Sequence, residues 1–378
     1  MSRIAYTAAQ VFDGEKLTGN IAVVVEGGLV QELVAAHGLA NDVTVHDLGN
    51  VILSPGFVDV QVNGGGGVLL NDDPSLQAIE TIIAAHRTFG TASLLPTLIT
   101  DTPDVTRRAV EAAIAAERAA TPGFAGLHLE GPHLSVKRHG AHDTALIRPM
   151  EADDLKMLLE AKSALRTLVV TVAPESVSPG QIGELAKAGV IVSLGHSDCS
   201  YDTAMRCFDA GTTMVTHLFN AMSQLGNREP GLVGAALASG AASAGLIVDG
   251  YHVHPAAMQA ALKAKAGPGA IFLVTDSMST VGSDIQSFTL NGREIIRSGG
   301  RLTLADGTLA GADIDMLACV RNAREMLGLP LESALAMATS APADALRRPD
   351  LGRLRPGCRA KMIVLEPNLK SVRMADAA

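Results

Sequence analysis

The chain has 378 residues, of which 47% are apolar and 18% charged, and its formal net charge is -9. This composition supports a large buried core and argues against disorder. The negative charge, the lack of tryptophan and the few other aromatic residues argue against general binding to nucleic acids or anionic membranes.

The first residues, Met1 to Tyr6, lack a basic segment followed by an apolar one, and no apolar stretch is long enough to span a bilayer. The four cysteines are scattered and form no Cys-x-x-Cys pair, which is typical of reduced packing residues. We therefore expect a cytoplasmic protein with neither a membrane nor a nucleic-acid partner.

Short strands with glycine turns are predicted near the N-terminus, over 21–28 and 43–49. The region around 352–365, near the C-terminus, has a similar pattern. We expect residues 1–53 and 346–378 to pair into one small β-sandwich domain. The segment 54–345 then forms a larger domain inserted between the two ends.

Strand-like and helix-like segments alternate within 54–345. The strand-like runs centre near residues 59, 93, 127, 170, 193, 214, 247 and 273. The stretches between them are alanine-rich with helical periodicity, as in 109–118. Eight such units predict an α/β fold, a (β/α)8 TIM-like barrel. Residues 286–310 interrupt the pattern and predict a hairpin over 288–295, inserted after the eighth strand.

Several of these runs end on a polar side chain of a metal-ligating, acidic or amide type. The runs are 56–61, 126–130, 191–196, 213–217, 246–249 and 272–276. The carboxyl ends of parallel barrel strands meet at one face, where active sites lie. We therefore expect these side chains to converge on one site.

Glu130, His196 and His217 form the predicted metal-ligand set. A single buried glutamate or histidine is more often only hydrogen-bonded. A carboxylate and two imidazoles at equivalent strand ends favour instead a divalent-metal site with an open position for water. Asp276 ends the last strand, where a carboxylate can take a proton from water and return it to a leaving group. The alternative for Asp276 is a helix N-cap.

Five motifs in order along nearly the whole chain carry a resemblance to a known family. They are Pro55–Gly64, His128–His133, Gly195–Asp198, Thr216–Met222 and Val248–His252. Together these motifs resemble the N-acetylglucosamine-6-phosphate deacetylase family of the amidohydrolase superfamily. The resemblance implies hydrolysis of N-acetyl-D-glucosamine 6-phosphate to D-glucosamine 6-phosphate and acetate, in amino-sugar catabolism and cell-wall recycling.

The resemblance also implies a role for individual positions. Glu130, His196 and His217 match the metal ligands, Asp276 matches the general acid/base, and His142 matches a catalytic contact to the amide carbonyl. The positions that match substrate contacts are Ala141, His142, Asn220, Ala221, Arg228, His252, Leu309, Ala310 and Gly311. Arg228 and His252 would contact the phosphate. A solvated loop charge remains the alternative for Arg228, and only one of His252 and His254 need face the site. The family suggests a homodimer.

Many amidohydrolases carry a His-x-His pair at the end of the first strand, which helps to hold a second metal ion. Here the corresponding positions are Gln61 and Asn63, and a neutral amide is a poor zinc ligand. We therefore expect one divalent ion per subunit, with Gln61 at most hydrogen-bonding a water molecule. Zinc is the expected ion, and Fe2+, Co2+ and Mn2+ are alternatives.

Two other functions remain open from the sequence. The same chemistry could act on N-acetylgalactosamine 6-phosphate or another N-acyl compound, because the sugar epimer is not readable from these residues. A catalytically inactive scaffold with the same fold is the alternative from a different class. Such a scaffold would be expected to lose the metal ligands or Asp276, and this chain keeps them.

Overall fold

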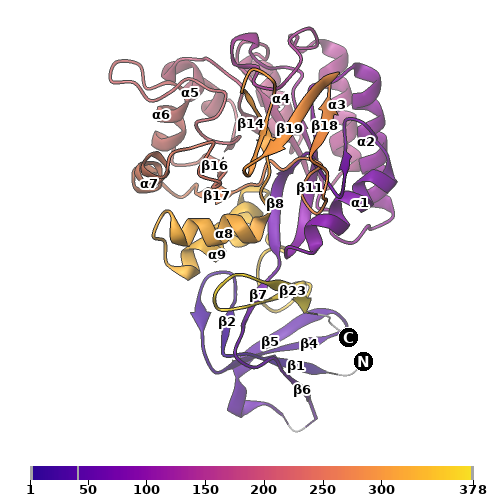
Figure 1. The fold of residues 1–378 in the computed structure, drawn as a ribbon, viewed down its shortest axis with the longest axis vertical. Coiled ribbons are helices and arrows are strands. Elements are labelled where there is room, and N and C mark those ends of the chain that lie inside the picture. The colour runs from indigo at the N-terminus through magenta and orange to yellow at the C-terminus, as the bar shows by residue number, and fades with distance from the viewer. Residues whose placement is uncertain (1–2, 41, 376–378) are drawn as a thin grey trace.

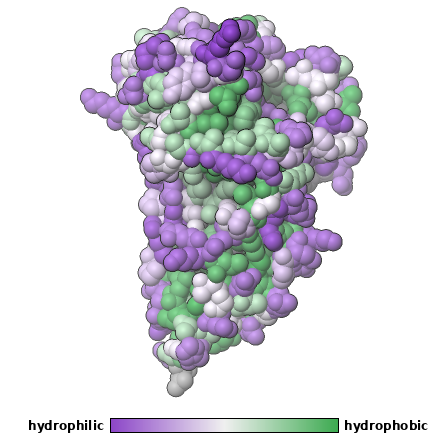
Figure 2. Space-filling view, turned by 90° about the vertical axis from the view of Figure 1, so that its left-hand side faces the viewer, coloured by the Kyte–Doolittle hydropathy of each residue, from purple (hydrophilic) through white to green (hydrophobic). Residues whose placement is uncertain are grey.

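The computed structural model describes residues 3–40 and 42–375. Figure 1 shows a barrel surrounded by helices above a smaller β domain, with both ends of the chain in the smaller part. The face shown in Figure 2 mixes apolar and polar groups and narrows toward the small domain. Among the described helices, none combines the length and apolar character that a membrane span needs.

The barrel consists of eight parallel strands in chain order around the sheet. They are β8 (Phe57–Val62), β11 (Thr91–Ile99), β12 (Leu127–Glu130), β13 (Leu168–Val172), β14 (Ile191–Leu194), β15 (Met214–Val215), β16 (Ser243–Leu246) and β17 (Ile271–Leu273). After β17, the Asp276 N–H donates to the Gln61 carbonyl at 3.0 Å and joins the last strand to the first. The predicted barrel is thereby confirmed.

Four strands end before the polar residue of their predicted run. β14 and β15 end two residues before His196 and His217, and β17 ends three residues before Asp276. β16 ends at Leu246, three residues before Asp249. Asp249 accepts hydrogen bonds from the backbone N–H groups of Tyr251 and His252 at 2.9 Å. The Asp249 side chain thus forms a turn with the backbone that follows β16.

Helices follow the strands and cover the outside of the barrel. They are α1 (Leu76–Arg87), α2 (Pro103–Arg118), α3 (Ala152–Ala164), α4 (Pro179–Lys187), α5 (Tyr201–Asp209), α6 (Gly231–Ala238), α7 (Pro255–Ala264), α8 (Met316–Glu325), α9 (Leu331–Ala338) and α10 (Ser340–Ala345). Short 3-10 turns lie at Ala36–Gly38 and Val136–Arg138. Local sequence sets several helix starts: Thr102 and Ser178 accept backbone N–H groups, each before a proline in the first turn.

The small domain contains two sheets. One has the order β5 (Leu29–Ala35), β4 (Ile21–Glu26), β1 (Ile4–Thr7) and β6 (Thr44–Asp47). The other has the order β23 (Val372–Ala375), β22 (Met362–Leu365), β7 (Ile52–Pro55), β2 (Gln10–Phe12) and β3 (Leu17–Thr18). Apolar side chains of both sheets share one core. Antiparallel pairing of β22 with β7 brings the two ends of the chain together as expected. The domain limits at 53/54 and 345/346 remain a prediction.

The insertion after the eighth strand is larger than the predicted hairpin. β18 (Ser287–Leu290) and β19 (Arg293–Ser298) form that hairpin, and β20 (Arg301–Thr303) and β21 (Leu309–Ala312) extend it to four antiparallel strands. A small core that includes Leu290, Ile295 and Leu302 holds this sheet against the barrel. A two-stranded ribbon, β9 (Gly64–Gly65) with β10 (Val68–Leu69), follows β8.

Candidate active site

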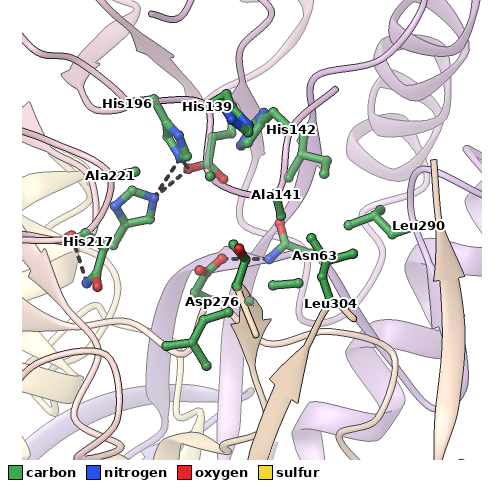
Figure 3. A pocket seen from close by; sticks show the side chains of 18 of the residues that line it. Asn63, His139, Ala141, His142, His196, His217, Ala221, Asp276, Leu290 and Leu304 are labelled. Atoms are coloured by element: carbon green, nitrogen blue, oxygen red, sulfur yellow. Dashed lines mark hydrogen bonds and ion pairs between the residues drawn. The ribbon is translucent and has the colours of Figure 1, made fainter. Parts of the chain in front are cut away.

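Three predicted metal ligands converge at the carboxyl ends of neighbouring strands. Glu130 is the last residue of β12, and His196 and His217 each lie two residues beyond β14 and β15. Glu130 Oε1 lies 3.1 Å from His196 Nε2 and 2.9 Å from His217 Nε2, and the two nitrogens are 3.0 Å apart. All three side chains are buried, and Figure 3 shows the two imidazoles directed at the same carboxylate.

The chemistry of this trio fits a divalent cation. The Arg138 carbonyl, which can only accept, lies 2.9 Å from His196 Nδ1 and therefore fixes the proton on that nitrogen. In neutral His196 the Nε2 lone pair then faces the Glu130 oxygen. Burial alone would raise the pKa of Glu130, but contacts with the two imidazoles hold that pKa well below its usual range. Burial would lower the pKa of His217, but its contact with Glu130 raises it, so Glu130 already stabilises positive charge at this point. An ionised carboxylate and two imidazole Nε2 atoms within 3.1 Å of one another are a ligand set for zinc or a similar ion.

His142 also lies near this cluster, since ligand atoms of Glu130, His142 and His196 all lie within 4.8 Å of one another. Its Nδ1, however, lies 2.7 Å from Thr100 Oγ1 and accepts from the Thr100 N–H at 3.3 Å. Burial, followed by the neighbouring His196, places the pKa of His142 well below its usual value. A neutral His142 therefore carries its proton on Nε2, which suits a hydrogen-bond donor better than a third imidazole ligand.

Two amides hold Asp276. Gln61 Nε2 donates to Asp276 Oδ1 and to Glu130 Oε2, each at 3.1 Å, and Asn63 Nδ2 donates to the same Asp276 oxygen at 2.7 Å. Gln61 thus contacts two carboxylates, which differs from the expectation that it would hydrogen-bond at most a water molecule. Burial, and then the charge of Glu130, raises the pKa of Asp276 to about 6. Both amides donate to Oδ1, so Oδ2 is the oxygen available for proton transfer.

The backbone leaves strand geometry at three of these residues. His196, His217 and Asp276 have φ values of 48°, 27° and 50°, in the left-handed region that non-glycine residues seldom adopt. Such conformations persist where the surrounding structure enforces them, and they cluster at functional sites. Gly195 is needed just before His196, because a Cβ there would lie 2.8 Å from Thr171 Cγ2.

A chain of hydrogen bonds crosses the barrel interior beneath the ligands. His128 Nδ1 lies 3.0 Å from the Val60 carbonyl, and burial lowers the pKa of His128 to about 4, so neutral His128 donates from Nδ1. Its Nε2 then accepts from Thr171 Oγ1 at 2.7 Å. Thr171 in turn lies 2.7 Å from Thr216, and Thr216 lies 2.7 Å from Ser193. This inner chain links the strands that carry Gln61, Glu130, His196 and His217.

A cavity of about 510 Å³ opens above the trio. The predicted substrate contacts that line it are Ala141, His142, Asn220, Ala221, His252, Leu309, Ala310 and Gly311. Glu130, His196, His217 and Asp276 line it as well. The structure brings these residues together, and their individual roles remain predictions.

Of the two neighbouring histidines, His252 faces the cavity. Its Nδ1 lies 2.5 Å from Asp249 Oδ2. His254 instead accepts the Ala256 N–H and caps α7. Arg228 is exposed in the loop before α6 and does not line the cavity of this chain. A phosphate contact from Arg228 within one subunit therefore has no support in this arrangement.

Several cavity residues were not predicted from the sequence. Lys137, Arg138, His139 and Arg293 add basic groups to the lining. Lys137 and Arg138 pair with Asp198, and Arg293 donates to the Ala141 carbonyl. The run of basic residues at 137–139, between Glu130 and His142, could have indicated in the sequence that this loop lines the cavity. Arg293 lies in the insertion, whose position over the site no local motif indicates.

The fold and site define a metal-dependent hydrolase of the amidohydrolase type. A model of the amidohydrolase family matches residues 52–377. The chain therefore belongs to the amidohydrolase family.

Three similar proteins narrow the comparison within that family. An N-acetylgalactosamine-6-phosphate deacetylase of Shewanella sp. is 41% identical, with 95% of this chain and 91% of the relative covered. An N-acetylglucosamine-6-phosphate deacetylase of Haemophilus influenzae is 34% identical, with 93% and 92% covered. The crystal structure of N-acetylglucosamine-6-phosphate deacetylase from Pasteurella multocida aligns with a TM-score of 0.94 at 32% identity and covers 99% of this chain and 98% of that one.

Proposed function

We propose that the protein hydrolyses the acetamide of N-acetyl-D-glucosamine 6-phosphate to D-glucosamine 6-phosphate and acetate. The observation that carries this proposal is the meeting of Glu130, His196 and His217 beside Asp276 in one cavity. The similar proteins named above act on 6-phosphorylated N-acetyl amino sugars, which supports the substrate class. The reaction belongs to amino-sugar catabolism and cell-wall recycling.

Glu130, His196 and His217 would hold the divalent ion, which supplies Lewis acidity and lowers the pKa of a water molecule. Asp276 accepts a proton through Oδ2 as the water oxygen attacks the acetyl carbon. The carbonyl electron pair moves onto the carbonyl oxygen, to which neutral His142 donates its Nε2–H. The C–N bond then breaks with its electron pair on nitrogen, and Asp276 returns the proton to the departing amine.

The wall formed by Asn220, Ala221 and His252 is the proposed place for the sugar phosphate. Asp249 holds His252 Nδ1, which leaves Nε2 for the ligand. The exposed position of Arg228 is compatible with a phosphate contact only in a neighbouring subunit. We therefore propose a homodimer in which Arg228 of one subunit completes the site of the other. Leu309, Ala310 and Gly311 of β21 would close over the sugar.

N-acetylgalactosamine 6-phosphate is the second candidate substrate. The relative at 41% identity acts on that epimer, whereas the relative at 34% identity acts on the glucosamine form. We further propose that the ion is zinc and that the protein is cytoplasmic. We also propose that residues 1–53 and 346–378 form the small β domain and that residues 54–345 form the barrel.

Acetate release from both epimers, with and without a chelator, tests the proposal. We expect turnover of N-acetylglucosamine 6-phosphate that is lost with the chelator and restored by Zn2+. Higher kcat/KM for the galactosamine epimer would select the second candidate. No release from either epimer by protein loaded with one ion would contradict the proposed function.

A further inference from the structure

Asn63 has an orientation that its neighbours determine. Asp276 Oδ1 lies 2.7 Å from the Asn63 amide nitrogen, and an ionised carboxylate can only accept, so the NH2 group must face Asp276. The amide oxygen of Asn63 therefore points away from Asp276. Figure 3 shows the Asn63 amide nitrogen directed at Asp276 and the residue as part of the cavity wall.

The Asn63 oxygen has no hydrogen-bond partner among the described residues, although the residue is only 3% exposed. A buried acceptor without a donor is destabilising, so its persistence needs an explanation. Asn63 lines the cavity next to the proposed proton carrier, so a molecule bound in that cavity lies beside the amide that carries this oxygen.

The substrate of the proposed function brings one donor to this position. Its acetamide has a carbonyl oxygen, directed in the proposal at the ion and His142, and one N–H. That N–H needs an acceptor when the amide enters a buried site. The nitrogen must also lie near Asp276, which protonates it, and Asn63 is bonded to Asp276.

We propose that Asn63 is a substrate-contacting residue whose Oδ1 accepts the N–H of the scissile acetamide. This inference rests on the proposed function. The contact orients the nitrogen beside Asp276 and favours an amide over an ester, which has no hydrogen at this atom. Gln61 offers the matched comparison, because it also donates to Asp276 Oδ1 and does not line the cavity.

The test compares an amide with an ester in the metal-loaded protein. N-acetylglucosamine 6-phosphate and 2-O-acetylglucose 6-phosphate would be assayed with wild type, Asn63→Ala and Gln61→Ala. Both variants lose a hydrogen bond to Asp276, so both should hydrolyse the amide and the ester more slowly than wild type. We expect Asn63→Ala to lower kcat/KM for the amide roughly 3- to 10-fold more than for the ester, the range for one neutral hydrogen bond. Gln61→Ala should lower both by the same factor.

Equal losses for amide and ester in Asn63→Ala would overturn the inference and leave Asn63 with a positioning role only. Metal content and thermal unfolding show whether each variant keeps its ion and its fold. If the alanine variant loses its ion, Asn63→Ser gives the same comparison and removes less of the side chain. A wild-type protein that hydrolyses neither substrate would refute the proposed function instead, so the two failures are distinguishable.

Discussion

The hydroxyl groups of Thr171 and Thr216 lie 2.7 Å apart inside the barrel, beneath the trio of Glu130, His196 and His217. Thr216 directly precedes His217, and Thr171 donates to His128, which lies two residues before Glu130. Because the inner chain links adjacent strands, it fixes the spacing of the ligands that these strands carry.

Thr171→Val should therefore weaken metal binding without unfolding the barrel. The change leaves His128 Nε2 without its donor and leaves the Thr216 hydroxyl with Ser193 as its remaining partner. A group bonded directly to a metal ligand is worth about 10-fold or more in metal affinity, so we expect a loss of up to about 10-fold for this more distant contact. Chelator competition would measure the affinity. Thr212→Val is the matched control, because the buried Thr212 hydroxyl has no partner among the described residues. Equal affinities in the two variants would contradict a role for the inner chain.

The number of bound ions is a second prediction. We expect about one tightly bound divalent ion per chain, because Gln61 and Asn63 donate hydrogen bonds to the carboxylates beside the trio. Elemental analysis after dialysis would measure the stoichiometry. Replacing both amides by histidine should raise it. Two ions retained by the unaltered protein would exclude the single-metal account.

Arg228→Ala should lower kcat/KM for the phosphorylated substrate much more than for N-acetylglucosamine itself. A charge-assisted contact to phosphate is worth about 1.5–3 kcal/mol, which is roughly 10- to 150-fold in kcat/KM. Arg118→Ala, on the outer helix α2, is the control for loss of an exposed positive charge. Sedimentation would show whether the protein is a dimer. Equal effects on the two sugars would assign Arg228 a role other than phosphate binding.

A buried carboxylate below the site makes stability depend on pH. Burial raises the pKa of Asp59 from 3.8 to about 7, against hydrogen bonds from Thr275 and Gln61 that lower it. The folded state therefore favours protonated Asp59. This contribution to stability is fully present below pH 3.8 and is lost as the pH rises through about 7.

Asp59→Asn, which stays neutral, should gain stability relative to wild type as the pH rises from about 5 to 8. The full shift of about 3 pKa units corresponds to about 4 kcal/mol as an upper value. Denaturant unfolding at several pH values would measure it, with Asp209→Asn as the exposed control. Parallel stability curves for wild type and Asp59→Asn would refute the shift.

The sequence predicted the barrel and its convergent residues because both follow from local patterns. Apolar runs that end on Glu130, His196 and His217 must place these side chains at one face once the strands are parallel. The contacts of Asn63 and Gln61 with Asp276 were not predicted, because they join the first strand to the last across some 213 residues of separation in the chain.

Positions outside the strand ends were harder to predict. A loop residue such as Arg228 has no periodicity that fixes its direction, and the structure places it away from the cavity of its own chain. Arg293 belongs to an insertion whose packing depends on the separate core around Ile295.

The turnover of Asp276→Asn with its ion in place tests the central claim most directly. The amide keeps the size of the side chain but cannot accept the proton from water, while Glu130, His196 and His217 still hold the ion. We expect normal metal content, intact fold and a kcat at least ~10²-fold lower for N-acetylglucosamine 6-phosphate, the lower end for loss of a positioned general base. Near-normal turnover by a folded, metal-loaded variant would contradict the account.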